Sequence, residues 1–240
     1  MTAPQTPGAP AKASLLEDFV DVFASPRELF TRRMGQTAWL VLFIVVVAGG
    51  LLYFATKGLM QPVFDAEWAR VMARIAAKNP QAAAAAEGMR ATSEKFIGVG
   101  IILGLLIGPI LTGLVIWAVG KMFGSVANVS DSVMVAIYAC IPRLLGFVAG
   151  AVIMLVIDPA SVTSKFTPTL SLGRFVDPAT TSPALFELAG RVDVFVIWQT
   201  ILIAIGLSVV GKMQRSQAYI AAAVIWLIGA AFPLIGALRQ

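Results

Sequence analysis

The sequence contains no histidine and a single cysteine, Cys140. The lack of histidine excludes an imidazole acid–base catalyst and any zinc site built from cysteine and histidine, and one cysteine cannot close a disulfide within the chain. Cys140 lies in an apolar run, where we interpret it as a small hydrophobic residue. The sequence also has no Walker loop, no zincin helix, no G-x-S-x-G motif and no pair of carboxylates inside an apolar run. We therefore expect no enzymatic activity, no cofactor and no bound metal.

Charged residues are also scarce. They make up 13% of the chain, against 58% apolar residues, and the mean hydropathy is +0.86. An ordinary soluble domain has about 25% charged and roughly 45–50% apolar residues. A soluble protein of this composition would lack the polar surface that water requires, so lipid is the expected solvent. The net charge of +5 suits anionic headgroups, but the basic residues are scattered, so we expect no nucleic-acid partner.

Five apolar runs are long enough to cross a bilayer. About 20 mostly apolar residues are needed, because a helix rises ~1.5 Å per residue across ~30 Å of hydrocarbon. The runs are continuous rather than alternating, and a helix satisfies its own backbone groups in lipid. The predicted fold is an all-α, polytopic transmembrane helix bundle with spanning helices at residues 38–56, 96–119, 132–157, 192–210 and 218–238.

The N-terminal region predicts surface helices ahead of the first span. Residues 1–13 are rich in alanine, proline and threonine, and we expect them to be disordered. Residues 14–37 predict an interfacial amphipathic segment, because apolar residues recur there at helical spacing among acidic and basic ones. A second short helix is expected to start at Ser25-Pro26, with Glu28 completing a capping box.

Two long loops differ in character. The alanine-rich insert at residues 57–95 predicts a helical hairpin outside the bilayer, with helices over 67–78 and 81–93. The loop at 158–191 carries four X-Pro steps and predicts an extended or turn-rich segment. Residues 38–240 together form the predicted transmembrane domain.

The two remaining loops are short, and their charges predict the orientation. Lysine and arginine favour the cytoplasmic side in short flanks. Such residues precede the first span and occupy both short loops: Arg27, Arg32, Arg33, Lys121, Lys212 and Arg215. We expect a multi-pass protein of the cell inner (plasma) membrane, with the N-terminus cytoplasmic and the C-terminus outside.

These short loops also resemble each other. Aligning the second and third spans with the fourth and fifth pairs Gly120-Lys121-Met122 with Gly211-Lys212-Met213, and Pro142 with Pro233. The pattern predicts a parallel repeat of two helix hairpins. Repeats of this kind often place a transport site between the two halves, although they also occur in bundles without one.

Arg143 is the main candidate for a functional residue. It follows Pro142 near the middle of the third run, and a charge at mid-membrane costs roughly 2.5–3.5 kcal/mol on insertion scales. Arg143 could pair with Asp193 or Asp131, which lie at predicted span ends, or bind a lipid phosphate. The alternative is that Pro142 breaks the helix, so that Arg143 reaches water or headgroups and only anchors the span.

Glycines recur every four residues in two spans. They are Gly100, Gly104 and Gly108 in the second span, and Gly146 and Gly150 in the third. Glycine lets helix backbones approach closely. We favour packing inside the chain's own bundle, with an interface between two copies as the alternative.

Several short stretches, in order and spacing, resemble the Yip domain family, whose eukaryotic members bind Ypt/Rab GTPases. They are SPRELF (25–30), GP (108–109), FGS (123–125), YACIP (138–142), DVFVIW (193–198), IGL (205–207) and KMQRSQA (212–218). The match looks like the bacterial branch. It implies five spans with a cytoplasmic N-terminus, and it adds Tyr138 to the candidate functional or lipid-contacting residues. Eukaryotic members act as trafficking adaptors and membrane shapers.

Two functional hypotheses follow. The first is a non-enzymatic membrane scaffold or adaptor for lipids or partner proteins. The lipid bilayer is the expected partner, and other membrane proteins or a second copy of the chain are further candidates. The alternative is a small-solute transporter or channel with a site near Arg143, and it predicts a polar cavity between the two helix hairpins.

Overall fold

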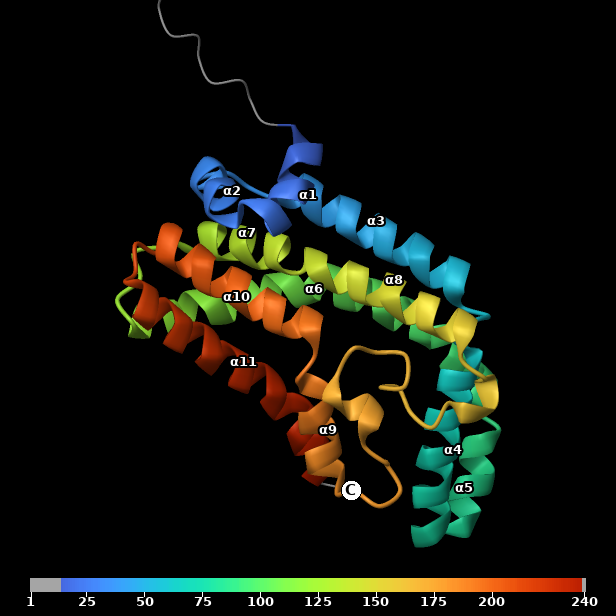
Figure 1. The fold of residues 1–240 in the computed structure, drawn as a ribbon. Helices are drawn as coiled ribbons and strands as arrows, with labels where there is room; N and C mark the ends of the chain where they lie inside the picture. The colour runs from blue at the N-terminus through green and yellow to red at the C-terminus, as the bar shows by residue number, and fades with distance from the viewer. Residues whose placement is uncertain (1–13, 239–240) are drawn as a thin grey trace, which may run out of the picture.

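The computed structural model describes residues 14–238, and all its named elements in that range are helices (Figure 1). The expected disorder of residues 1–13 lies outside the described part. Four helical segments are long and apolar enough to cross a membrane: α3 (Trp39–Thr56), α6 (Arg90–Met122), the pair α7–α8 (Val129–Val156) and α11 (Arg215–Leu238). The polytopic helical bundle is therefore confirmed.

The predicted fourth span is shorter than each of these four segments. It corresponds to α10 (Val194–Val209), which has 16 residues. At ~1.5 Å per residue this helix is about 24 Å long, which is less than the ~30 Å of hydrocarbon. Asp193 caps the N-terminus of this helix: its Oδ1 accepts hydrogen bonds from the backbone N–H groups of Phe195 at 2.8 Å and Val196 at 3.3 Å.

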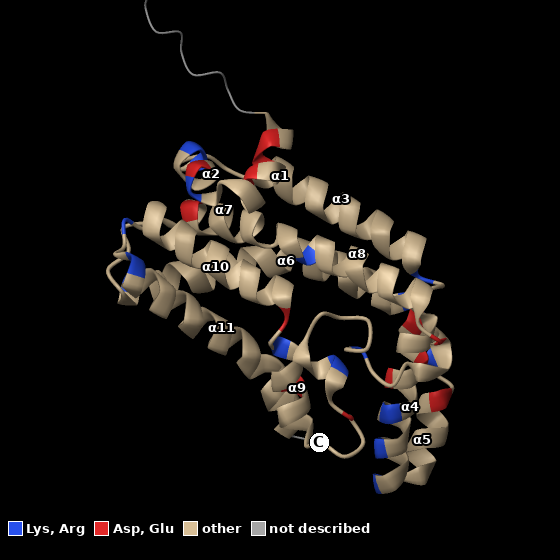
Figure 2. Cartoon of the chain, viewed as in Figure 1, with Lys and Arg blue, Asp and Glu red and all other residues tan. Residues whose placement is uncertain are grey.

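The outer surface of the bundle is apolar, and charges gather at its margins. Large side chains such as Phe43, Leu111, Val152 and Phe232 are exposed along the long helices. Figure 2 shows lysines, arginines and acidic residues mainly in the N-terminal helices, the loops and the α4–α5 hairpin, with little charge along the bundle. This distribution suits a protein whose middle faces lipid and whose ends face headgroups and water.

The third span is broken in its middle. Helix α7 (Val129–Ala139) ends at Cys140, and α8 (Ile141–Val156) starts directly after it with Pro142 in its first turn. Proline lacks a backbone N–H, so it fits the first turn of a helix but not its interior. A break at Pro142, which the sequence analysis left open as one of two alternatives, is present.

Helix α7 occupies the centre of the core, between α6 and α10. Met134, Ala136 and Tyr138 are buried along its length. Its neighbours approach closely because each has a glycine at the contact. A methyl group at Gly113 of α6 would lie 2.5 Å from Cα of Val133, and one at Gly206 of α10 would lie 2.4 Å from Cγ1 of Val135. Small residues thus allow three helices to pack at short range, where dispersion contacts are strongest.

The two short turns lie together at one end of the bundle. The N–H of Val126, after α6, donates a 3.0 Å hydrogen bond to the carbonyl of Gly211, after α10. The two aligned Gly-Lys-Met triplets nevertheless differ in conformation. Lys121 belongs to the last turn of α6, whereas Lys212 lies in the turn itself with φ +51°. The two hairpins share their direction but not the structure of their turns.

The predicted extramembrane hairpin consists of α4 (Gln61–Lys78) and α5 (Pro80–Glu87). Asn79 separates them and caps α5, because its Oδ1 accepts 3.1 Å hydrogen bonds from the N–H groups of Gln81 and Ala82. Helix α6 then begins at Arg90, so the second arm is shorter than the expected 81–93 and the spanning helix starts earlier.

The proline-containing loop packs against the bundle. It holds two short 3₁₀ helices, η1 (Pro159–Ser161) and η2 (Leu172–Phe175), and then α9 (Pro183–Arg191). Ser182 caps α9 through a hydrogen bond from the N–H of Leu185. Helix α9 lies against α11, and this contact brings the end of the loop to the membrane-spanning helices (Figure 1).

Candidate functional site

The N-terminal segment forms a helical hairpin, α1 (Leu15–Ala24) followed by α2 (Pro26–Arg33). Ser14 caps α1 by accepting a hydrogen bond from the N–H of Glu17 at 3.2 Å. The capping box expected at Ser25 is not formed, because Ser25 makes no side-chain capping bond. Ser25 also ends α1, and its dihedral angles (φ −144°, ψ 55°) serve the sharp turn between the two helices.

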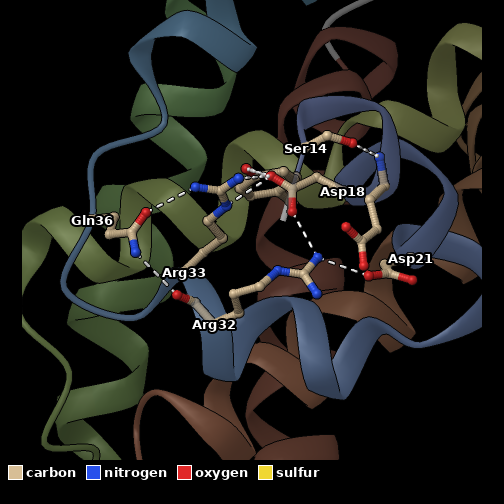
Figure 3. Close-up of polar contacts among 8 residues, drawn as sticks. Ser14, Asp18, Asp21, Arg32, Arg33 and Gln36 are labelled. Carbon is tan, nitrogen blue, oxygen red and sulfur yellow. Dashed lines mark hydrogen bonds and ion pairs between the residues drawn. The ribbon is translucent and has the colours of Figure 1, made fainter. Parts of the chain in front are cut away.

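A fully buried carboxylate fastens this hairpin to the bundle. Asp18 of α1 is 0% exposed. Its Oδ1 accepts a 2.8 Å hydrogen bond from Nη2 of Arg32, and its Oδ2 accepts one of 2.7 Å from Nε of Arg33 and one of 2.8 Å from the hydroxyl of Tyr138 in α7. Figure 3 shows both guanidinium groups converging on Asp18. A buried ion is tolerable only when its lone pairs are satisfied in this way.

The outer members of the same network are less buried. Arg32 also donates to Asp21 at 2.7 Å, and Arg33 donates to Gln36 at 2.9 Å (Figure 3). Hydrogen bonding to Asp18 raises the pKa of Arg32, so this group stays charged at any ordinary pH. Tyr138, which the family resemblance had put among the candidates, is therefore one of the residues by which the bundle contacts the N-terminal hairpin.

Arg143 lies on the other side of the broken span and lines a cavity of about 240 Å³. The cavity is bounded by α6, α8, α9, α10 and α11, so it lies between the two helix hairpins. A second arginine, Arg191 at the end of α9, lines the same cavity together with the polar residues Thr112, Gln199 and Thr200. None of the residues that line the cavity is acidic.

The carboxylates proposed as partners of Arg143 are engaged elsewhere. Asp193 caps α10, and Oδ1 of Asp131 accepts a 2.8 Å hydrogen bond from the N–H of Gly35, in the linker before α3. Within residues 14–238, neither Arg143 nor Arg191 makes an ion pair. The expected pairing of Arg143 with an acidic residue is therefore not seen in the described part of the chain.

Arg191 was not identified from the sequence, and its surroundings are unusual. Its Nε is buried without a hydrogen-bond partner. Burial, and next the charge of Arg143, lower the pKa of Arg191. The guanidinium lies against the backbone of α11 at Gly229, where a methyl group would come within 2.2 Å of Nη2. No sequence signal marked Arg191, because it stands in a loop that was expected to lie outside the bilayer.

A larger cavity, of about 350 Å³, lies between α3, α4 and α6. Its charged lining residues include Glu67 and Glu94, and both already have cationic partners: Arg70 at 2.8 Å and Arg90 at 3.6 Å. The rest of the lining is mainly apolar. Lys57 also lines this cavity, is exposed and makes no ion pair within residues 14–238, so the cavity holds one unpaired cation, whereas the other cavity holds two arginines.

The two glycine series differ in their surroundings. A methyl group at Gly146 would lie 3.0 Å from the ring of Phe195, and one at Gly150 would lie 2.9 Å from the carbonyl oxygen of Pro168. At Gly100, Gly104 and Gly108, by contrast, a methyl group would meet no atom within 4 Å. The expected packing of these three glycines inside the chain's own bundle is not seen.

A bundle of apolar helices with a docked N-terminal hairpin defines a polytopic α-helical membrane protein. Residues 20–236 match the family model described as the Yip1 domain, and the chain belongs to this family. It is also similar to "Membrane protein YknW" of Bacillus subtilis (strain 168), with 25% identity over 149 residues, which is 62% of each chain. The chain thus spans less than two thirds of that relative's length. No solved structure matches it.

Proposed function

We propose that this protein is a non-enzymatic membrane scaffold or adaptor for lipids or partner proteins, and that the α1–α2 hairpin provides its binding surface. The observation that carries this proposal is the contrast between the two faces of the hairpin. Val22, Leu29 and Phe30 are 0% exposed on its inner face, whereas Leu16 and Val20 on the outer face of α1 are 79% and 62% exposed. The hairpin is fixed to the bundle and still presents an uncovered apolar surface.

The linker to the first span keeps this apolar surface at the membrane. Helix α2 ends at Arg33 and α3 begins at Trp39, so the chain between them is too short to carry the hairpin away from the bilayer. Leu16, Val20 and Phe23 follow helical spacing and form one stripe on α1. The occupant that fits a stripe in this position is the interfacial layer of the lipid bilayer itself.

The proposed orientation places this hairpin on the cytoplasmic side of the inner (plasma) membrane. Arg27 of the hairpin and the lysines of both short turns, Lys121 and Lys212, support it through the preference of basic residues for that side. The C-terminal end of α11 then lies outside, with the α4–α5 hairpin.

The proposal is tested with spin labels at positions 16 and 17 in the purified protein reconstituted into liposomes. Leu16 belongs to the exposed apolar stripe, and Glu17 is its polar neighbour on α1. We expect the label at 16 to be accessible to oxygen in the lipid and the label at 17 to a water-soluble nickel reagent. Equal exposure of both labels to water would contradict the interfacial surface. Solute flux through the liposomes that Arg143→Ala abolishes would contradict the scaffold.

A second candidate function is supported by a different observation. The cavity that contains Arg143 lies between the two helix hairpins, where a small-solute transporter or channel would place its site. This hypothesis expects efflux of an anion from loaded liposomes, with a rate that falls in Arg143→Ala. Absence of efflux for every anion tried, with a folded protein in the liposomes, would count against it.

A further inference from the structure

Two arginines that make no ion pair within residues 14–238 share the cavity between the helix hairpins. Arg143 comes from α8 and Arg191 from the end of α9, and both line a space of about 240 Å³ without an acidic residue. Arg143 is exposed and Arg191 is half-buried, with its Nε buried. Two like charges that line one cavity repel each other, and an anion bound between them would relieve this repulsion.

The donors in the cavity match the chemistry of a phosphate group. A guanidinium offers a planar fork of N–H groups that binds two oxygens of a phosphate or carboxylate at once. Nε of Arg191 is buried and has no partner. Gln199 and the hydroxyl-bearing Thr112 add neutral polar groups to the same lining.

The rest of the lining indicates how such an anion reaches the site. Leu111, Phe232 and Ile228 line the cavity and are also exposed on the outer surface of the bundle, Phe232 by 83%. The cavity is thus bordered by residues that face lipid. A phosphate that is covalently attached to acyl chains can enter from this side while its chains stay against the exposed apolar residues.

We propose that Arg143 and Arg191 form a binding site for a phosphate-type anion, with a phospholipid headgroup as its first source and free inorganic phosphate as the other. The site does not depend on the role of the N-terminal hairpin. It names the ligand of the cavity that the second candidate function would use, and binding stands whether or not the ligand crosses the membrane.

The lack of a side chain at Gly229 leaves room for the guanidinium of Arg191 in this site. The guanidinium of Arg191 occupies the space that a methyl group at position 229 would fill, with Nη2 only 2.2 Å from it. The clash involves the far end of a flexible side chain, so Gly229→Ala can fold while its methyl group displaces the guanidinium. Gly236 of the same helix has no atom within 4 Å of a built methyl group and provides the matched control.

The experiment is equilibrium binding to the purified full-length protein in a neutral detergent, with short-chain phosphatidylglycerol as one probe and inorganic phosphate as the other. The variants are Arg143→Gln, Arg191→Gln and Gly229→Ala. The controls are Gly236→Ala and Arg215→Gln, since Arg215 is exposed and does not line the cavity. We expect each cavity variant to weaken binding by at least about tenfold, and each control by less than about twofold.

The two probes separate the sources of the anion. Binding of phosphatidylglycerol that depends on Arg143 and Arg191 supports the headgroup, and arginine-dependent binding of inorganic phosphate alone supports the free ion. Binding that falls equally in Arg215→Gln, or that no cavity variant changes, would overturn the proposal. If an arginine variant fails to fold, the comparison of Gly229→Ala with Gly236→Ala decides. Arginine-dependent binding without anion efflux would keep the site and reject the transporter.

Discussion

Replacing Asp18 by asparagine tests how firmly the N-terminal hairpin is held. The fully buried carboxylate accepts hydrogen bonds from Arg32, Arg33 and Tyr138 at 2.7–2.8 Å. Removing one partner of a buried ion pair typically costs about 3–5 kcal/mol. Asparagine keeps the shape and one oxygen, and the two arginine side chains are 27% and 20% exposed, so water can recover part of their solvation. We therefore expect the lower end of this range, about 3 kcal/mol.

The assay is hydrogen exchange of the hairpin amides in a lipid nanodisc. A loss of about 3 kcal/mol raises the undocked population roughly a hundredfold, and the amides of Val22 and Phe30 should exchange faster by that factor. Asp21→Asn is the matched control, because Asp21 contacts Arg32 alone and lies nearer the surface, which predicts a change below about 1 kcal/mol. Equal effects of the two variants, or less than a threefold change in Asp18→Asn, would refute the reasoning.

Three further outcomes are expected. Gly113→Ala should lower the free energy of unfolding by roughly 1–3 kcal/mol, since its methyl group would overlap backbone atoms of α7, whereas Gly104→Ala should not; chemical denaturation in mixed micelles measures both. Asn79→Ala removes the cap of α5 and should destabilise the α4–α5 hairpin by about 1 kcal/mol, seen as faster limited proteolysis. In a cysteine-free background, a cysteine at Ala82 should be labelled from outside intact cells and one at Val126 should be protected; the reverse pattern would invert the proposed orientation.

The bundle was predictable from the sequence because membrane insertion leaves a composition signal in each span separately. The two sites depend on distant contacts, and local patterns do not reveal these. The hydroxyl of Tyr138 donates a hydrogen bond to Asp18, which is 120 positions away in the sequence. The sequence placed Arg191 in a loop, and only the contact of α9 with α11 in the structure shows that it lies beside Gly229. The glycine spacing was equally uninformative, because Gly104 and Gly146 share the same pattern and only the neighbours distinguish an open face from a packed one.

The broken third span explains how one element serves two separate sites. Tyr138 lies in the last turn of α7, and Arg143 lies in the first turn of α8, five positions later and beyond the break at Cys140. The α7 half therefore meets the N-terminal hairpin, and the α8 half borders the cavity. The two sites share no hydrogen-bond partner, and their polar side chains come from opposite sides of the break at Cys140. Substitutions at Asp18 and at Arg191 therefore act on different surfaces of the protein, so the scaffold and the anion site stand or fall separately.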